Sequence, residues 1–170
     1  MKRLPFRTAT VCALLAVAAS PALVQAQQDG WTTVVVTRHA EKLDGDDPSL
    51  SEAGRARALL LSGMLAESGV EAIYTTPYRR TRETIAPLAA ATGLEARTME
   101  ARATEELAAR ILAEHRGDLV VVAGHSNTVP ALVTALGAPE VDAIPEERYG
   151  DLFVVTIDPE GRATALRVAY

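Results

Sequence analysis

Thiols are almost absent from this sequence, because one cysteine, Cys12, occurs in 170 residues. Cys12 lies inside an apolar N-terminal run, and apolar sequence continues after it, which does not fit a lipid-attachment site. The chain after Cys12 therefore has no disulfide, no cysteine-based metal site and no cysteine nucleophile. This composition suits an oxidising compartment.

Positive charge is also in deficit, with 17 lysines and arginines against 22 aspartates and glutamates and a net charge of −5 at pH 7. An acidic protein repels polyanions on average, which disfavours nucleic acid as a partner. Any anionic substrate must therefore meet a pocket that is basic locally.

The N-terminal segment has the layout of a secretory signal peptide. Basic residues are followed by a nearly unbroken apolar run, Ala9–Val24, and small residues stand at the positions that a signal peptidase reads. We expect residues 1–26 to be a signal peptide cleaved after Ala26, which implies a periplasmic or secreted protein. The alternative is an uncleaved membrane anchor, but the apolar run is short for one and Pro21 interrupts it.

The remaining residues, 27–170, have the length of one ordinary domain, and no later apolar run is long enough to span a membrane. We expect strands near residues 33–37, 72–75, 95–98, 119–123, 152–157 and 163–168. We expect helices near residues 51–68, 76–92, 104–115 and 126–136, with a kink or break at Pro87. This alternation predicts an α/β three-layer sandwich with a mostly parallel central sheet, helices on both faces and an antiparallel hairpin at the end.

Two of the three histidines follow hydrophobic strands directly. His39 ends the stretch Val34–His39, and His125 ends the stretch Leu119–His125. Ligands bind at the carboxyl ends of parallel strands, so neighbouring strands would bring both side chains into one crevice. The alternative is that each histidine only satisfies a local hydrogen bond. The third, His115, falls in the last turn of an expected helix, and we interpret it as a surface residue.

Arginines occur at the same predicted edge of the sheet. Arg38 precedes His39, and Arg80 lies in a cluster at a helix start after the second strand. Guanidinium groups bind phosphate oxygens bidentately, and helix N-termini favour anions. Two histidines and two arginines would suit a tetrahedral dianion. We interpret Arg79 and Arg82 as a solvated helix face.

Four ordered segments resemble the histidine phosphatase superfamily, which includes phosphoglycerate-mutase-like enzymes and acid phosphatases. Thr37–Glu41 resembles the Arg-His-Gly signature, and Leu50–Ala58 resembles the helix after the first loop. Tyr74–Thr84 is similar to the Ser-Pro-x-x-Arg-x-x-Gln-Thr segment, and Val122–Asn127 is similar to the second histidine segment. The match covers nearly the whole of residues 27–170 and implies a phosphoglycerate-mutase-like fold.

The resemblance implies a phosphatase that needs no metal or other cofactor. His39 would attack phosphorus as a neutral imidazole and become a phosphohistidine, which water then hydrolyses. Arg38, Arg80 and His125 would hold the phosphoryl oxygens in the transition state. The substrate would be a phosphorylated small molecule or a phosphoprotein, and a mutase activity is disfavoured by the short chain.

Several positions depart from the family pattern or leave a role open. Ala40 stands where glycine is usual, and we expect it to be tolerated, as we do Thr75 and Glu83 in place of serine and glutamine. Many members use a carboxylic acid to protonate the leaving group. The first candidate for this acid is Glu100, and Glu41 is a possible alternative.

Other polar residues are weaker candidates. Glu105 and Glu106 begin a helix, where their charge favours the helix dipole. Asn127 is a possible contact in the site, and Ser126 is expected to cap the helix that follows it. Without a dedicated acid, the enzyme would favour substrates with good leaving groups, such as phosphohistidine.

Two other classes of function remain open from sequence alone. One is a catalytically inactive domain of the same fold that binds phosphoryl groups or another protein. The other is a metal-dependent hydrolase with His39, His125 and Glu41 as ligands, although neighbouring arginines would repel a cation.

Overall fold

The computed structural model of the protein describes residues 30–170, so the predicted signal peptide at residues 1–26 lies outside the described part. The strands are β1 Thr32–Arg38, β2 Val70–Thr75, β3 Ala96–Thr98, β4 Leu119–Gly124, β5 Asp151–Ile157 and β6 Ala163–Ala169. The helices are α2 Glu52–Leu65, α3 Arg79–Thr92, α4 Thr104–Glu114 and α5 Thr128–Ala135.

All the strands join one sheet in the order β3-β2-β4-β1-β5-β6. The pairs β3–β2, β2–β4 and β4–β1 are parallel, whereas β5 and β6 form an antiparallel hairpin beside β1. The prediction of a mostly parallel α/β sheet with a terminal hairpin is confirmed. In the register of β1 and β4, Arg38 pairs with Gly124, so His39 and His125 follow at the same level.

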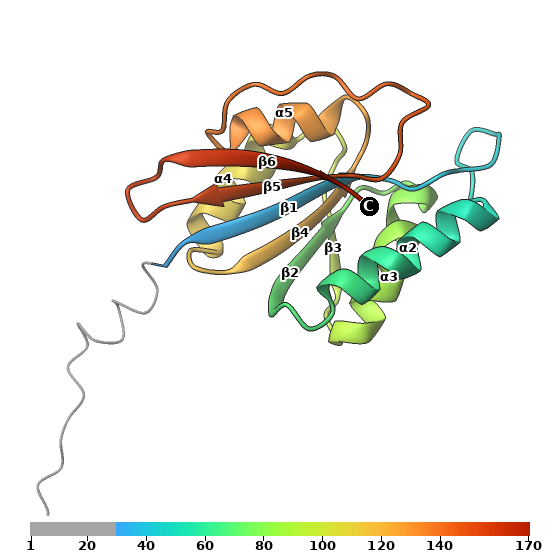
Figure 1. Cartoon of the computed structure of the whole chain (residues 1–170), viewed down its shortest axis with the longest axis horizontal. Helices are drawn as coiled ribbons and strands as arrows, with labels where there is room; N and C mark the ends of the chain where they lie inside the picture. The colour runs from blue at the N-terminus through green and yellow to red at the C-terminus, as the bar shows by residue number, and fades with distance from the viewer. Residues whose placement is uncertain (1–29) are drawn as a thin grey trace, which may run out of the picture.

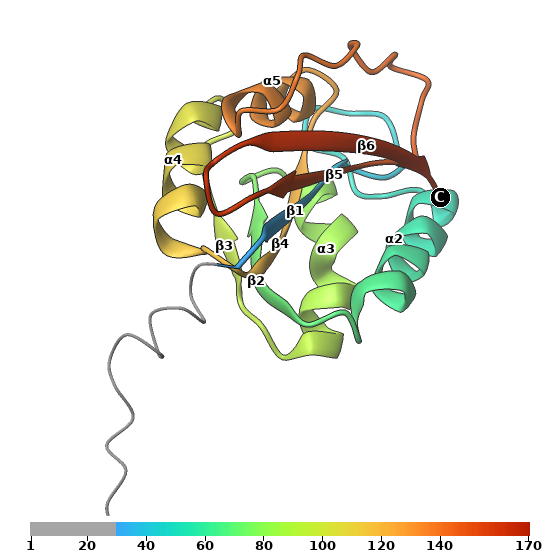
Figure 2. The same cartoon turned by 60° about the vertical axis from the view of Figure 1, so that its left-hand side comes forward.

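Helices cover both faces of the sheet, with α4 and α5 on one side and α2 and α3 on the other (Figures 1 and 2). Side chains alternate along β1, so Val34 and Val36 pack with α4 and α5 while Val35 packs with α2 and α3. A strand buried on both faces must be apolar throughout, which explains the continuous run of valines. None of the helices within residues 30–170 combines the length and apolarity that crossing a bilayer requires.

Helix α2 begins where the sequence predicts. The hydroxyl of Ser51 accepts a hydrogen bond from the backbone N–H of Gly54 at 3.1 Å and caps the first turn. Gly54 also permits a close approach, because a Cβ atom there would overlap the backbone carbonyl of Glu41. The first loop and α2 are therefore packed backbone to backbone.

Helix α3 differs from the prediction. It begins at Arg79 rather than at residue 76, because Tyr78 has an extended backbone and forms the N-cap. Pro87 neither divides nor ends the helix, which continues to Thr92. Ile85 and Leu88 on either side of Pro87 are buried in the core, and this packing offsets the hydrogen bond that proline cannot donate.

His115 is buried, so its interpretation as a surface residue is wrong. Its Nδ1 lies 3.0 Å from the carboxylate of Asp118, and its Nε2 lies 3.0 Å from the hydroxyl of Tyr74. The turn between α4 and β4 folds His115 back over the sheet, where these two partners satisfy both ring nitrogens. It lies at the opposite end of β4 from His125.

Candidate active site

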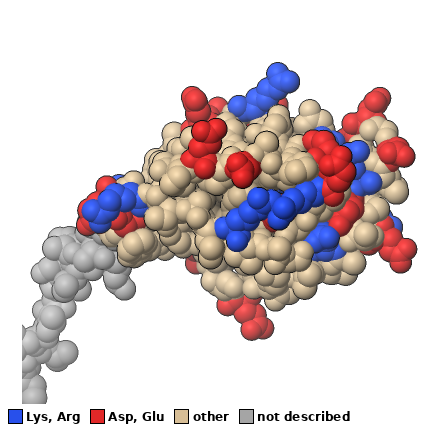
Figure 3. All heavy atoms as spheres, turned by 45° about the horizontal axis from the view of Figure 1, so that its top comes forward, with Lys and Arg blue, Asp and Glu red and all other residues tan. Residues whose placement is uncertain are grey.

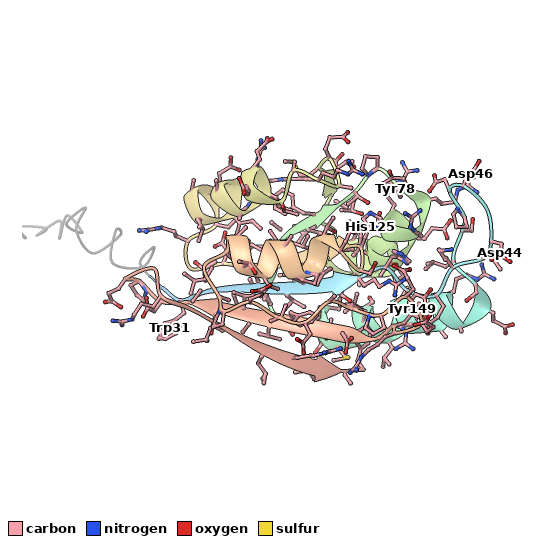
Figure 4. The ribbon with its side chains drawn as sticks, turned by 90° about the horizontal axis from the view of Figure 1, so that it is seen from above. Trp31, Asp44, Asp46, Tyr78, His125 and Tyr149 are labelled. Carbon is pink, nitrogen blue, oxygen red and sulfur yellow. The ribbon has the colours of Figure 1, made fainter. Side chains whose placement is uncertain are left out.

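His39 and His125 meet at the carboxyl edge of the sheet. Their ring centroids are 5.6 Å apart, and both side chains are almost fully buried. The backbone N–H of His39 donates to the carbonyl of Gly124 at 2.9 Å, which continues the β1–β4 ladder to the site. Figure 4 shows His125, Tyr78 and Tyr149 toward the same end of the molecule, away from Trp31. The parallel register thus brings the two strand-end histidines together.

Hydrogen bonds define which nitrogen of each ring carries the proton. Nδ1 of His39 lies 2.8 Å from the carbonyl oxygen of Ala40, and because a carbonyl only accepts, Nδ1 is the donor. The Nε2 atom of His39 therefore keeps its lone pair. Arg80 donates to Nδ1 of His125 at 3.4 Å, so Nε2 of His125 donates to the hydroxyl of Thr76 at 3.0 Å.

The hydroxyl of Thr76 continues this chain. It lies 2.7 Å from the hydroxyl of Thr81, which in turn donates to the carbonyl of Tyr78 at 2.8 Å. The chain runs from His125 through two threonines to the backbone at the start of α3. It fixes the orientation of the His125 ring.

Burial lowers the pKa of His39 to about 4 and that of His125 to about 4. The positive charges of Arg38 and Arg80 lower the pKa of both rings further. Both histidines are therefore neutral at pH 7. A neutral imidazole is the form that can act as a nucleophile.

Arg38 is buried beside the two histidines and is held by the loop before β5. Its Nη1 lies within 3.0 Å of the carbonyl oxygens of Pro145, Glu146 and Arg148. Its Nη2 donates to the carboxylate of Glu146 at 2.8 Å, and the ring of Tyr149 lies 4.4 Å from the guanidinium. Among the described residues, Nε of Arg38 has no hydrogen-bond partner although it is buried.

Arg80 approaches the site from the first turn of α3. Its guanidinium lies 4.4 Å over the ring of Tyr78 and 3.8 Å from the carboxylate of Asp47. Within residues 30–170, its buried Nε also lacks a partner. The neighbouring Arg79 and Arg82 are exposed, in agreement with a solvated helix face. Arg38 and Arg80 thus each have a buried Nε–H near the histidines that donates to no described residue.

A pocket of about 490 Å³ contains both histidines and Arg80. Its other lining residues are Lys42, Tyr78, Ala101, Arg102, Ser126, Asn127, Thr128 and Glu146. Glu146, Tyr78, Lys42 and Arg102 were not among the residues predicted for the site. Lys42 and Arg102 lie in loops without a periodic pattern, whereas Tyr78 lies inside a segment that had already been singled out.

The candidate acids lie elsewhere. Glu100 is exposed and borders a small cavity that adjoins the histidine pocket at Ala101 and Thr128, but it does not line the histidine pocket itself. Glu105 and Glu106 are exposed in the first turn of α4. Glu41 points to α2, where Arg57 binds both of its carboxylate oxygens at 2.6 to 3.0 Å. The ion pair with Arg57 lowers the pKa of Glu41.

Two neighbouring positions have clear structural roles. Ala40 is fully buried against Leu50 and Ala58. Its backbone φ is not positive, so the backbone conformation at this position does not require glycine. Ser126 does not cap α5, because Asn127 occupies that position. The hydroxyl of Ser126 instead bonds Glu146 at 2.5 Å.

His39, His125 and Glu41 do not form a metal site, because the Glu41 carboxylate is bound by Arg57 of α2 and does not line the pocket of the two histidines. From residue 30 to residue 170, no three His, Cys, Asp or Glu side chains form a group suited to a metal ion. The positive charges of Arg38 and Arg80 beside His39 make this site suited to an anion.

Comparison with known proteins agrees with this geometry. Residues 34–102 match the model of the histidine phosphatase superfamily (branch 1). A search of curated proteins by sequence found no match.

Solved structures share the fold at low sequence identity. The protein histidine phosphatase SixA, complexed with tungstate, is 21% identical with a TM-score of 0.67, over 81% of this chain and 96% of SixA. A mycobacterial glucosyl-3-phosphoglycerate phosphatase is 15% identical with a TM-score of 0.60, over 82% of this chain and 98% of that chain. Residues 34–102 thus match the histidine phosphatase superfamily by sequence, and the described domain shares the fold of these phosphatases.

Proposed function

We propose that this protein is a metal-independent phosphatase that hydrolyses a phosphomonoester or a phosphoramidate through a phosphohistidine on His39. The observation that carries the proposal is the hydrogen bond from Nδ1 of His39 to the carbonyl of Ala40 at 2.8 Å. It leaves Nε2 as an unprotonated nucleophile beside two arginines and His125.

In the first step, Nε2 of His39 attacks phosphorus, and the bond from phosphorus to the leaving oxygen or nitrogen breaks. Arg38 and Arg80, each with a buried Nε free to donate among the described residues, would bind the phosphoryl oxygens. In the second step, water attacks phosphorus, the bond to Nε2 breaks and inorganic phosphate leaves. His39 returns to its neutral form.

The leaving group must receive a proton or depart readily without one. Within residues 30–170, Glu146 is the one carboxylate that lines the pocket. The hydrogen bond from Ser126 lowers its pKa, so at pH 7 it is ionised and a poor acid. The pocket therefore favours substrates with good leaving groups, such as phosphohistidine, and SixA, named a protein histidine phosphatase, has the same fold.

The apolar N-terminal run with its basic start supports a periplasmic or secreted location as part of this proposal. Mass determination of the N-terminus after expression with the leader would test it. We expect the mature chain to begin at Gln27.

The decisive assay is hydrolysis of p-nitrophenyl phosphate and of phosphohistidine, with and without EDTA, by the wild type and by His39→Ala. We expect turnover that EDTA leaves unchanged and that the substitution abolishes. Loss of activity in EDTA would refute the metal-independent mechanism. Circular dichroism of His39→Ala is the control for folding.

A second candidate function is phosphoryl binding without turnover. It is favoured by the missing neutral acid and by Glu146, which already pairs with Arg38. Binding of phosphate by a folded wild type that hydrolyses none of the substrates would support this candidate.

A further inference from the structure

We propose that Glu146 is a resident anion on Arg38 that an incoming phosphoryl group must displace. In the free protein the carboxylate would occupy the guanidinium edge used by a phosphoryl oxygen, and so set how tightly phosphate binds. This inference rests on the proposed function, because it assigns Arg38 to the phosphoryl group.

The carboxylate of Glu146 is held between the two strand ends that carry the histidines. One oxygen accepts from Nη2 of Arg38 at 2.8 Å, and the other bonds the hydroxyl of Ser126 at 2.5 Å. Arg38 precedes His39, and Ser126 follows His125. Glu146 also lines the histidine pocket, so its negative charge lies where a dianion would enter.

The two side chains of this ion pair differ in exposure, which permits another anion to replace the Glu146 carboxylate. The side chain of Arg38 is 2% exposed, whereas that of Glu146 is 72% exposed. A carboxylate facing solvent regains water when it leaves, so the pair contributes little net free energy. A phosphoryl dianion with several oxygens can take its place and also reach the free Nε of Arg38.

Arg38 stays in place during such an exchange. Nη1 is bound by three backbone carbonyls of the loop, which do not depend on the Glu146 side chain. Only the partner of Nη2 has to change. The guanidinium is therefore preorganised for an anion whether or not Glu146 is present.

A resident carboxylate weakens the binding of phosphate by competition and by charge repulsion. Product phosphate would then leave more readily. Removing the charge of Glu146 should therefore tighten phosphate binding. Substitution of a pocket residue usually has the opposite effect and weakens binding.

The test is the affinity for inorganic phosphate, measured by calorimetry at constant ionic strength. We expect Glu146→Gln to bind phosphate roughly three- to tenfold more tightly than the wild type, as expected for removal of one exposed ion pair. Glu147→Gln is the matched control, because Glu147 is the exposed neighbour and makes no hydrogen bond or ion pair among residues 30–170. It should stay within about twofold of the wild type, since Glu147 does not line the histidine pocket and its solvent-facing charge is screened.

Unchanged or weaker phosphate binding in Glu146→Gln, or an equal gain in Glu147→Gln, would overturn the inference. If the wild type hydrolyses phosphohistidine in that case, the proposed function stands without it. If Glu146→Gln binds phosphate more tightly but no substrate is hydrolysed, the proposed role of Glu146 stands and the proposed phosphatase activity is refuted. If neither protein binds phosphate, both proposals fail.

Discussion

The rings of His39 and His125 are neutral because the fold buries them beside two guanidinium groups. Their pKa values lie at about 4, below the usual 6.5. Unfolding exposes both rings, so between about pH 4 and 6.5 the unfolded chain binds more protons than the folded one. The folded state is therefore favoured less as the pH falls through this window.

The first prediction follows from these two histidines. Urea unfolding should show that stability decreases from pH 7 to pH 4.5 by on the order of 3 kcal/mol for each histidine at most. The double variant His39→Gln, His125→Gln should lose less stability over the same range. Equal losses in the wild type and the double variant would contradict the assignment of neutral rings.

A second prediction concerns the hydroxyl of Thr76, which accepts from His125. Thr76→Val should reduce kcat/KM by roughly fivefold, because one orienting hydrogen bond is worth about 1 kcal/mol. Nitrogen NMR should also show a shifted Nε2 resonance of His125, because Nε2 loses its acceptor while Arg80 still donates to Nδ1. Thr92→Val, at the far end of α3, removes a similar hydroxyl and should change neither measurement.

Among the secondary structure elements, α2 contains two glycines that differ in their surroundings. Gly54 packs against the carbonyl of Glu41, whereas a Cβ at Gly63 would meet nothing within 4 Å. We predict that Gly54→Ala destabilises the protein by roughly 2 kcal/mol through overpacking, despite the better helix propensity of alanine. Gly63→Ala should stabilise it by about 0.5 to 1 kcal/mol. Urea unfolding of both variants measures the difference, and destabilisation by both would contradict it.

The elements themselves were largely predictable because their patterns are local. Apolar runs predict β1 and β4, and Gly93 ends α3 in a left-handed conformation as its sequence suggests. The parallel pairing of β1 with β4 then places His39 beside His125. Pro87 does not divide α3, because burial of Ile85 and Leu88 outweighs the tendency of proline to interrupt a helix.

The features that could not be predicted from the sequence depend on contacts between segments far apart in the chain. Arg38 and Glu146 are 108 positions apart, and the loop around Glu146 has neither helical nor strand periodicity. Glu100 follows β3 in sequence, but it borders the adjoining cavity rather than the histidine pocket. His115 resembles an ordinary helix end, although the turn after it buries the ring.

On the scale of the whole molecule, one ion pair joins three remote segments. Arg57 of α2 binds Glu41 after β1 and also donates to the backbone carbonyl of Tyr170 at 2.6 Å. Glu41→Gln should lower stability by about 1 to 3 kcal/mol, because the half-buried guanidinium loses its charged partner. Activity per folded molecule should be nearly unchanged, since Glu41 lies outside the pocket. A loss of kcat comparable to that of His39→Ala would return Glu41 to the catalytic site.

Charges of both signs are interspersed over the face seen in Figure 3, where lysine and arginine side chains adjoin aspartate and glutamate. Such a surface does not attract anions over long distances. Under the proposed function, recognition of phosphate would then depend on local contacts with the buried Arg38 and the partly buried Arg80. Salt should therefore have only a modest effect on the rate of substrate capture.

The bonds from Arg38 to the carbonyls of residues 145–148 have a consequence for the order in which the chain is made. A ribosome delivers β1 early, but the residues that hold Arg38 emerge more than a hundred positions later. A nascent or unfolded chain thus carries His39, the proposed nucleophile, before Arg38 is held in the position proposed for phosphate binding. Under the proposed function, the chain would therefore have no phosphatase activity until its last quarter has been made and the domain has folded.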